Sequence, residues 1–429
     1  MSSPSRTGPD LGASIGASSG ASTGASIGAS IGASTGASTG ARTVAGTAAP
    51  AAVLAALELQ ARACREHGSP FYAGLLGHLA AAVADPALDN DTDPDNDTDP
   101  DPGRDEQAPG RLLVELLTST GSRDLLADAV VLRLLGGVHR LVLERAIPRL
   151  ALHWPSVGGD GDPNAAWQVL RVVLPEHAAQ LARSMVHAPQ TNEVGRGAAL
   201  LGLAHRVGAV FGLPLRLAEI GASAGLNLLA DRFAVSQVSA AAHWIGPDDA
   251  LVRLSAAWDG TLPQFCDTLR VIERLGCDLH PIDVTTTAGR LLVSSYVWPD
   301  DRARWERLRA ALATAQRYPV TVVAQSAAKF VETLMLRQGS TLLLWHSVVW
   351  QYLPAAEQVA VELAIEQLGA AATGDSPFCV AALEPKTRDG AVRFEVSLRC
   401  WPAAGPGLLA GQPQVLAESA PHGVPTLWF

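Results

Sequence analysis

Residues 215–229 read Leu-Arg-Leu-Ala-Glu-Ile-Gly-Ala-Ser-Ala-Gly-Leu-Asn-Leu-Leu and carry the clearest candidate chemistry in the chain. An apolar strand is expected here, followed by a loop of small residues and then an apolar helix. This layout brings backbone N–H groups and a helix N-terminus close to a ligand. The stretch has two interpretations, because Glu219, Gly221, Ser223 and Gly225 fit a loop that holds a nucleotide-like cofactor, while Gly-x-Ser-x-Gly also matches the nucleophile elbow of a serine hydrolase.

In the cofactor interpretation, Glu219 stands at the end of the predicted strand, where ligands bind in open α/β sheets. A carboxylate at that place repels a phosphate but accepts hydrogen bonds from a cationic amino group. S-adenosylmethionine carries an ammonium and a sulfonium, so it suits this loop better than a dinucleotide does. The glycine spacing also differs from the Gly-x-Gly-x-x-Gly pattern of dinucleotide sites. We therefore expect S-adenosylmethionine as the cofactor.

In the hydrolase interpretation, Ser223 is the nucleophile, and Asp375 and His422 follow it in the chain order that α/β hydrolases use. Hydrolase sheets place several strands before the elbow, whereas Ser223 follows the first predicted strand of its domain. This order favours the cofactor interpretation and leaves the hydrolase as an alternative. A non-catalytic ligand-binding or sensor protein on the same fold is a third hypothesis.

A polar segment lies just before that strand and contains Gln190, Asn192, Glu193 and Arg196. If the segment is helical, Asn192 and Arg196 share one face. We predict that Asn192, Glu193 and Arg196 bind a carboxylate or amide substrate. The alternative is a capped helix start with a salt bridge.

His346 ends another apolar strand, which in an α/β sheet points its last residue towards the ligand crevice. An imidazole with a pKa near 6.5 can act as a general base, so His346 is predicted to be catalytic. The alternative is a buried histidine whose hydrogen bonds are satisfied.

An aromatic and acidic cluster follows at Tyr296, Trp298, Asp300 and Asp301. Tyr296 and Trp298 are predicted to line a pocket for a cationic or ring-bearing substrate. Alternatively, one of the two aspartates simply caps the helix that is expected over 301–317.

Hydrophobic periodicity divides the chain into a helical and an α/β part. Ala- and Leu-rich segments with helical spacing predict a mainly helical N-terminal region over 50–190. From 191 to 429, strands and helices alternate, which predicts a mostly parallel sheet with helices on both faces and an antiparallel C-terminal edge. The predicted strands are 215–220, 269–275, 290–298, 320–324, 341–346, 378–383, 391–401 and 424–428. The helices predicted in this part are 195–211, 226–233, 301–317, 327–337 and 354–369.

Two low-complexity segments are expected to be disordered: a Gly-Ala-Ser repeat within residues 1–49 and an Asp-rich insertion at about 86–109. The net charge of −10 and the scattered 32 basic residues argue against a nucleic-acid partner. Five cysteines without C-x-x-C spacing argue against a disulfide framework or a metal site. With no secretory signal or membrane span expected, we predict a cytoplasmic protein that acts on a small molecule, and leave its oligomeric state open.

The layout of residues 191–429 resembles the class I S-adenosylmethionine-dependent methyltransferases, whose glycine loop follows the first strand of a Rossmann-like sheet. The resemblance implies that Glu219, Gly221 and Gly225 line the methionine end of the cofactor, with Ser223 in place of a common glycine. It also implies that an amide, Gln325, reads the adenine. An acid at the end of the second strand would hold the ribose, and we favour Asp278. The other acids near that strand end are Glu273 and Asp283.

A second and more specific resemblance covers about 55–429 and joins the chain to an uncharacterised actinobacterial family, domain of unknown function 2332. It implies no established activity. The leading hypothesis is therefore S-adenosylmethionine-dependent methyl transfer to an unknown small molecule. The segments that carry the resemblance include Gly-Ser-Pro-Phe-Tyr at 68–72, Leu-Leu-Gly-Gly-Val-His-Arg-Leu-Val-Leu at 134–143, Gln-Thr-Asn-Glu-Val-Gly-Arg at 190–196, Gly-Cys-Asp-Leu-His-Pro-Ile-Asp at 276–283 and Trp-His-Ser-Val-Val-Trp-Gln-Tyr-Leu-Pro at 345–354.

Overall fold

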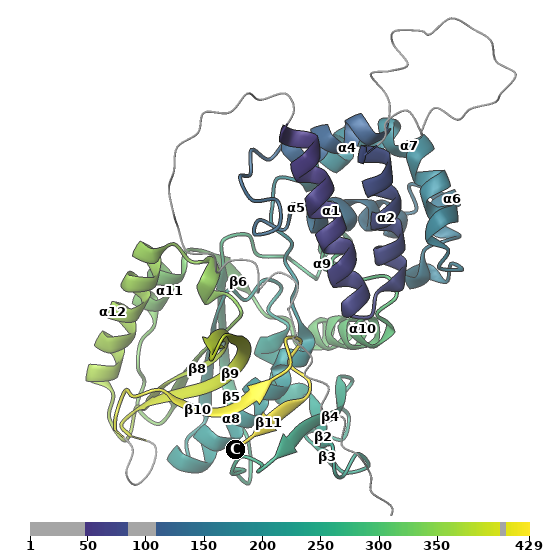
Figure 1. The fold of residues 1–429 in the computed structure, drawn as a ribbon. Coiled ribbons are helices and arrows are strands. Elements are labelled where there is room, and N and C mark those ends of the chain that lie inside the picture. The colour runs from purple at the N-terminus through teal and green to yellow at the C-terminus, as the bar shows by residue number, and fades with distance from the viewer. Residues whose placement is uncertain (1–47, 85–108, 404–408) are drawn as a thin grey trace, which may run out of the picture.

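The computed structural model describes residues 48–84, 109–403 and 409–429. A group of helices packs beside a large sheet, and helices α9 and α10 lie between the two (Figure 1). The predicted repeat tail at 1–49 and the Asp-rich insertion at 86–109 fall almost entirely outside the described residues. In the described part of the chain, no helix combines the length and apolar character that crossing a bilayer requires.

The N-terminal region is helical, as the periodicity predicted. Its apolar faces form one core, in which Tyr72 and Trp154 are buried among leucine, valine and alanine side chains. Asp162 begins the longest of these helices by accepting hydrogen bonds from the N–H groups of Asn164 and Ala165. The helices are α1 (Ala48–Glu66), α2 (Pro70–Ala84), α4 (Pro109–Thr118), α5 (Val130–Leu143), α6 (Pro148–Ala151) and α7 (Pro163–Ser184).

The C-terminal part is mixed α/β and is built on one mostly parallel sheet. In the described residues, the sheet has eleven strands in the order β3-β2-β4-β11-β10-β9-β8-β7-β1-β5-β6. The five strands from β8 to β6 are all parallel. After β1, the chain adds β5 and β6 on one side and β7 and β8 on the other, so the strand order reverses at β1. Ligand crevices form beside such a reversal, at the carboxyl ends of the strands. The strands are β1 (Leu215–Ile220), β2 (Ala234–Gln237), β3 (Trp244–Ile245), β4 (Arg253–Gly260), β5 (Val271–Asp278), β6 (Val322–Ala324), β7 (Thr341–Ser347), β8 (Phe378–Arg388), β9 (Ala391–Trp401), β10 (Gln414–Ser419) and β11 (Thr426–Trp428).

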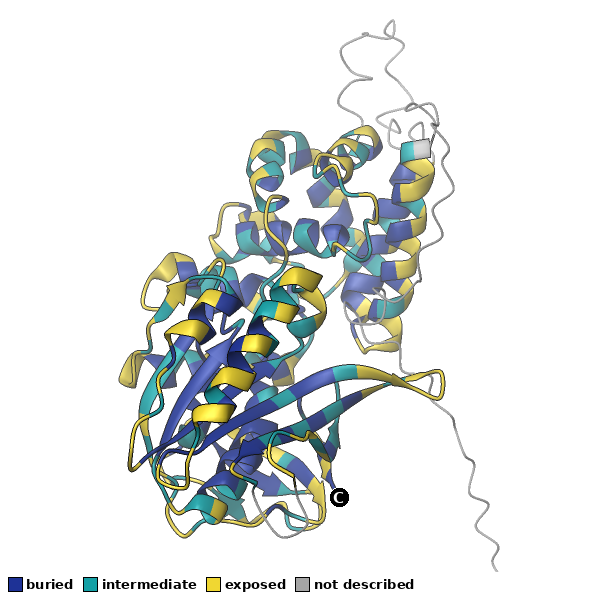
Figure 2. Ribbon diagram, turned by 90° about the vertical axis from the view of Figure 1, so that its left-hand side faces the viewer, coloured by how far each residue is buried: buried dark blue, intermediate teal, exposed yellow. Residues whose placement is uncertain are grey.

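Helices cover both faces of the parallel strands. Alternate residues of β1 enter two separate cores, because side chains along a strand point to opposite faces. Leu215 and Leu217 pack with α8 and α10, whereas Ala218 and Ile220 pack with α11 and α12. Figure 2 shows the result, with buried strands and exposed outer helix faces. The helices are α8 (Gly197–Phe211), α9 (Thr287–Ser295), α10 (Arg302–Arg317), α11 (Ala327–Thr333) and α12 (Ala355–Ala371).

Three details of the predicted fold are wrong. The segment 290–298 forms most of helix α9 and not a strand, since a short apolar run carries no decisive period. The segment 226–233 is a 3₁₀ helix. The antiparallel C-terminal strands are not an edge, because β11 pairs with β4 and the sheet continues through β2 and β3. The strands β2, β3, β4 and β10 were not predicted from the sequence.

Candidate functional site

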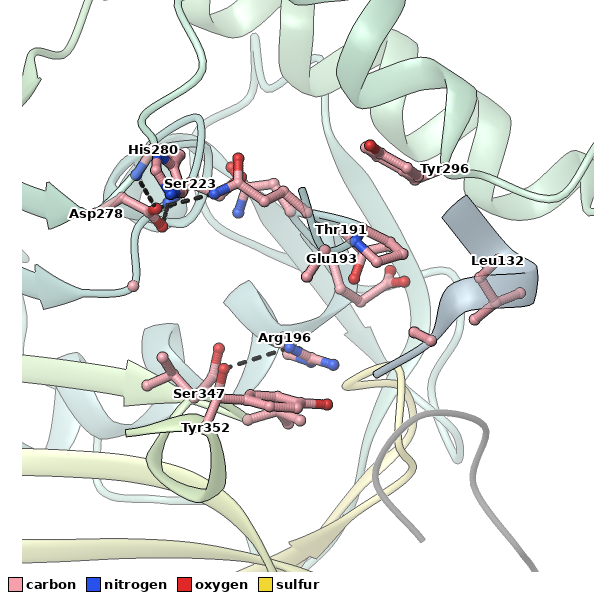
Figure 3. A pocket seen from close by; sticks show the side chains of 18 of the residues that line it. Leu132, Thr191, Glu193, Arg196, Ser223, Asp278, His280, Tyr296, Ser347 and Tyr352 are labelled. Atoms are coloured by element: carbon pink, nitrogen blue, oxygen red, sulfur yellow. Dashed lines mark hydrogen bonds between the residues drawn. The ribbon is translucent and has the colours of Figure 1, made fainter. Parts of the chain in front are cut away.

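A cavity of about 540 Å³ lies at the carboxyl ends of β1, β5, β6 and β7, beside the reversal of strand order. Residues of α2, α5 and the segment after α9 form its opposite wall, so the helical region covers the sheet at this point (Figure 3). All the predicted site residues except Gly225 and His346 line it. They are Asn192, Glu193, Arg196, Glu219, Gly221, Ser223, Asp278, Tyr296, Trp298 and Gln325.

The two glycines of the loop have a packing role that the sequence did not indicate. Gly221 has a φ of 67°, and a Cβ there would lie 2.6 Å from Val349 Cγ2. Gly225 has a φ of 72°, closes a turn onto Ala222 and faces Val322. Both therefore need glycine for backbone conformation and close contact within the protein. The prediction that Gly225 contacts a cofactor is not supported by its position.

Of the three acids considered for the ribose, Asp278 is the one that lines the cavity. Its Oδ2 accepts a hydrogen bond from the Ser223 N–H, and its Oδ1 accepts from the His280 N–H and from Gln190 Nε2, each at 2.9 Å. A carboxylate offers about four acceptor positions, so these three contacts leave capacity for a ligand hydroxyl. Asp278 thus ties the loop after β1 to the end of β5.

The other two candidate acids lie elsewhere. Glu273 sits earlier in β5 and forms ion pairs with Arg216 and Arg337. Asp283 is exposed and accepts hydrogen bonds from Thr285. The pairing of β5 with β1, which sets Gly276 opposite Glu219, decides that Asp278 and not the others reaches the loop.

Glu219 is the last residue but one of β1, on the face that carries Leu217, and it is only 2% exposed. Its Oε2 atom makes no hydrogen bond to any described residue. Burial, and then the neighbouring charge of Asp278, raises the pKa of Glu219 well above its usual value, while Arg196 and Trp345 oppose this only in part. A buried carboxyl group with an unused oxygen at a cavity wall is suited to a cationic or N–H-bearing ligand.

The polar segment at 190–196 has no regular structure before a 3₁₀ turn over Val194–Arg196, in place of the helix that would put Asn192 and Arg196 on one face. Asn192 Oδ1 accepts a hydrogen bond from the Leu226 N–H at 2.9 Å and so holds the end of the glycine loop. Asn192 is 8% exposed, and its acceptor is therefore used within the protein.

Glu193 is buried and bound by positive groups. Arg304 Nε donates to Glu193 Oε2 at 2.7 Å, and His422 Nδ1 lies 3.2 Å from the same oxygen. Burial alone would raise the pKa of Glu193, but the charges of Arg304 and then His422 and Arg307 outweigh burial and lower it well below its usual value. Glu193 is therefore a charged group within the wall of the cavity.

Arg196 points its guanidinium into the cavity with few partners (Figure 3). It donates at 3.4 Å to the backbone oxygens of Ser347 and Pro421, and it forms no ion pair with a carboxylate of a described residue. Burial lowers its pKa, although a guanidinium stays charged. Arg196 is thus a cation of the cavity that has no ion-pair partner among the described residues. It lies close to Glu219, which has an unused oxygen.

The wall opposite the sheet is aromatic and apolar. Tyr296 lies against Gly136 of α5, where a Cβ would come within 2.7 Å of the Tyr296 ring. Trp298 packs into the helical core. The hydroxyl of Tyr72 is buried at the cavity without a described partner, and sequence reasoning missed this residue, although it lies in the Gly-Ser-Pro-Phe-Tyr segment.

The two aspartates beside this wall have structural roles. Asp301 caps α10 by accepting a hydrogen bond from the Arg304 N–H. Asp300 accepts from Ser69 Oγ at 2.6 Å and from the Phe71 N–H at 2.9 Å, at the start of α2. Asp300 therefore links the helical wall to the α/β part. The hydrogen bonds of both aspartates are explained by these structural roles, without a bound substrate.

His346 does not reach the cavity. It pairs in register with Ile220, so it points to the α11 and α12 face, opposite to Glu219. Its Nδ1 lies 2.8 Å from Glu384 Oε1, and its ring lies against Trp350. The catalytic role predicted for His346 is therefore not supported, and the alternative of a satisfied buried histidine describes its position.

The hydrolase triad is not assembled. Ser223 has a φ of 52°, and its buried hydroxyl makes no hydrogen bond to a described residue. The backbone oxygen of Asp375 accepts from the Gly339 N–H, at the amino ends of β7 and β8 and thus at the opposite end of the strands. His422 lies beside Glu193 instead.

Gln325 follows β6 and lines the cavity. Its backbone N–H donates a hydrogen bond to the backbone oxygen of Asp278. The sequence analysis named Gln190 without predicting a role for it, and it named His422 only in the alternative hydrolase triad. Gln190 donates a hydrogen bond to the Asp278 carboxylate, and His422 lines the cavity wall. A signal for Gln190 existed, because it shares the polar segment with Asn192 and Glu193.

Comparison with known proteins places the chain in a family without giving it an activity. No curated protein and no solved structure matches the chain. One family model matches residues 103–428, which include every strand and nearly all of the cavity lining. Because the match covers most of the chain, this protein belongs to the family described as "Uncharacterized protein conserved in bacteria (DUF2332)".

Proposed function

We propose that the cavity binds S-adenosylmethionine and that the protein transfers its methyl group to a small molecule held against the helical wall. The observation that carries this proposal is Glu219, a buried carboxyl group at the end of the central strand with an oxygen that no described residue uses. The ammonium of the cofactor's methionine end would supply the missing donor. The volume of about 540 Å³ is within the range of small-molecule sites.

The partner groups around Glu219 support the same ligand. Arg196 offers a guanidinium without a carboxylate partner, and its charge acts on Glu219. A ligand end with both an ammonium and a carboxylate would satisfy the two residues together. Asp278 retains acceptor capacity for a ribose hydroxyl, and Gln325 lines the cavity beyond the next strand end.

The strand order supports a Rossmann-like fold of the methyltransferase type. The parallel strands β6-β5-β1-β7-β8 repeat the order 3-2-1-4-5 of doubly wound nucleotide-binding sheets. An antiparallel strand, β9, lies beside the fifth parallel strand, as the resemblance to methyltransferases implies. The extension through β11, β4, β2 and β3 departs from that pattern.

The work of the protein in this proposal is positioning. The cofactor supplies an activated methyl group, and transfer requires the acceptor atom to approach in line with the bond that breaks, so holding the acceptor in place accounts for most of the catalysis. Tyr296, Leu132 and Tyr72 form a wall that would hold the apolar part of an acceptor. The same wall keeps water away from the reacting atoms.

Calorimetry with S-adenosylhomocysteine tests the proposal. Wild type is expected to bind it, and Glu219→Gln is expected to weaken binding by about tenfold to a hundredfold, the cost of losing one or two charge-assisted contacts. Glu306→Gln, an exposed residue of α10, is the matched control and should bind as wild type does. Failure of the wild type to bind would refute the proposal. Covalent labelling of Ser223 by a fluorophosphonate would favour the hydrolase instead.

A further inference from the structure

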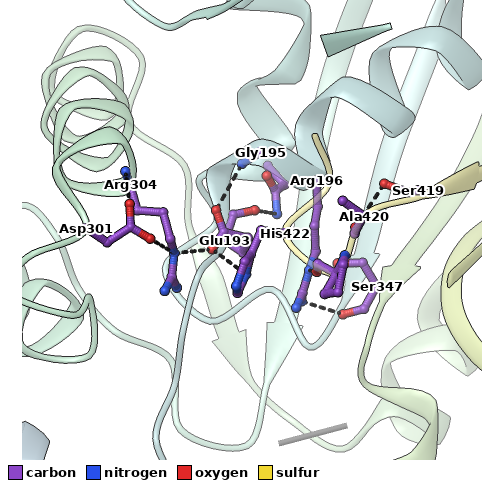
Figure 4. A network of polar contacts seen from close by, with 11 residues as sticks. Glu193, Gly195, Arg196, Asp301, Arg304, Ser347, Ser419, Ala420 and His422 are labelled. Atoms are coloured by element: carbon purple, nitrogen blue, oxygen red, sulfur yellow. Dashed lines mark hydrogen bonds and ion pairs between the residues drawn. The ribbon is translucent and has the colours of Figure 1, made fainter. Parts of the chain in front are cut away.

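His422 lies on the segment between β10 and β11 and lines the same cavity as Glu219 and Arg196. Figure 4 shows Arg304 and His422 on two sides of the Glu193 carboxylate. The His422 Nδ1 atom is 3.2 Å from Glu193 Oε2, and the His422 side chain is 45% exposed. The histidine is therefore accessible, while the carboxylate that orients it is buried.

Close backbone packing fixes this pair. A Cβ at Gly195 would lie 2.2 Å from the backbone oxygen of His422. A Cβ at Gly423 would lie 2.2 Å from the backbone nitrogen of Arg196. The segments on either side of the pair thus touch backbone to backbone at two glycines. Arg196 Nε also donates to the Pro421 oxygen. These contacts hold the imidazole next to Glu193 and beside the Arg196 guanidinium.

The carboxylate decides which ring nitrogen of His422 is free. Glu193 is 5% exposed, is bound by Arg304 at 2.7 Å and is charged, so it attracts the proton of the His422 ring to Nδ1. The Nε2 atom then carries the lone pair. The present Nδ1–H direction is poorly aligned with Oε2, which is common for such pairs before a ligand binds.

We propose that His422 is the general base of the reaction and that Glu193 positions it. This inference rests on the proposed methyl transfer. A hydroxyl or amine acceptor forms its bond to the methyl carbon, the methyl–sulfur bond breaks with its electron pair remaining on sulfur, and the acceptor proton passes to His422 Nε2. Since the ring is partly exposed, the proton can leave to solvent.

Three other histidines of the described chain, His346, His139 and His280, are less suited to the role. His346 lies on the opposite face of the sheet, and His139 is buried between Ser156 and the Ser295 oxygen. His280 lines the cavity, but its ring contacts His187 and has no carboxylate partner among the described residues. His422, in contrast, lines the cavity and has Glu193 as an orienting carboxylate.

Carbethoxylation by diethyl pyrocarbonate, which attacks an unprotonated imidazole nitrogen, tests the pair in the full-length protein. Mass spectrometry of peptides is expected to find His422 modified, and Glu193→Gln is expected to slow this reaction by about tenfold, a typical loss when an orienting carboxylate is removed. His153, whose Nδ1 lies 3.0 Å from the exposed Asp160, is the matched control. Its rate should fall with Asp160→Asn but not with Glu193→Gln.

A measurement on the wild type keeps the test valid if Glu193→Gln does not fold. Nitrogen-15 spectra of histidine-labelled protein are expected to show His422 as the Nδ1–H tautomer. A His422 that is inert, that is found as the Nε2–H tautomer, or that reacts equally fast in the folded Glu193→Gln variant would overturn the inference. Absence of S-adenosylhomocysteine binding would refute the proposed function, whereas the reactivity of His422 is measured without any cofactor.

Discussion

Replacing Glu219 with glutamine is expected to change how the stability of the protein depends on pH. The carboxyl group is buried, and its pKa is raised well above the usual 4.5 by burial and then by the charge of Asp278. At a pH between the usual pKa and the raised one, the unfolded chain has an ionised Glu219, whereas the folded chain keeps it protonated. The folded state then binds about one proton more than the unfolded state, so the free energy of unfolding falls as pH rises above 4.5.

The size of the effect follows from proton linkage. Each pH unit between the two pKa values costs about 1.4 kcal/mol of stability. Within that interval, wild type should therefore lose about 1.4 kcal/mol per pH unit relative to Glu219→Gln, which has no proton to lose. The glutamine has almost the same shape as the protonated carboxyl group, so the two proteins should have similar stability near pH 4.5.

Urea unfolding followed by circular dichroism at several pH values measures this difference directly. Glu306→Gln removes an exposed carboxylate of α10 and should parallel the wild type. If wild type and Glu219→Gln differ by the same amount at every pH, Glu219 is ionised in the folded protein and the reasoning fails. Binding of S-adenosylhomocysteine should ionise Glu219 and release about one proton, which calorimetry in buffers of different ionisation enthalpy detects.

Three further outcomes are expected. Burial lowers the pKa of His139 from 6.5 to about 3. Between these pH values the unfolded state binds the extra proton, so the free energy of unfolding falls as pH drops. His139→Gln should remove about 1.4 kcal/mol per pH unit of this slope in acid unfolding curves. Gly221→Ala should cost about 2 kcal/mol or more in urea unfolding, because φ is positive and the new Cβ meets a valine, whereas Gly374→Ala, with open space, should cost far less. Arg304→Met should destabilise by about 3 kcal/mol because it leaves Glu193 buried without its main partner, and a loss below about 1 kcal/mol would contradict that account.

Local signals in the sequence were enough for the elements that begin and end sharply. The strand predicted at 215–220 is β1 without any shift, since a fully buried apolar run is bounded by Pro214 and Gly221. The helical region and the alternation after residue 191 were also predictable, because long amphipathic segments carry a clear period. The short strands β2, β3 and β4 were not, since what stabilises them is pairing with one another and with β11, far along the chain.

For the candidate site, the sequence by itself determined that Glu219 ends a buried strand before a loop of small residues, and that a polar segment precedes it. Only the tertiary structure decided which acid and which histidine join Glu219. Register sets Asp278 at the strand end, and strand alternation turns His346 to the other face. Two glycine contacts bring His422 to Glu193 across more than half of the chain. Such choices depend on long-range pairing and packing, for which neighbouring residues carry no local signal.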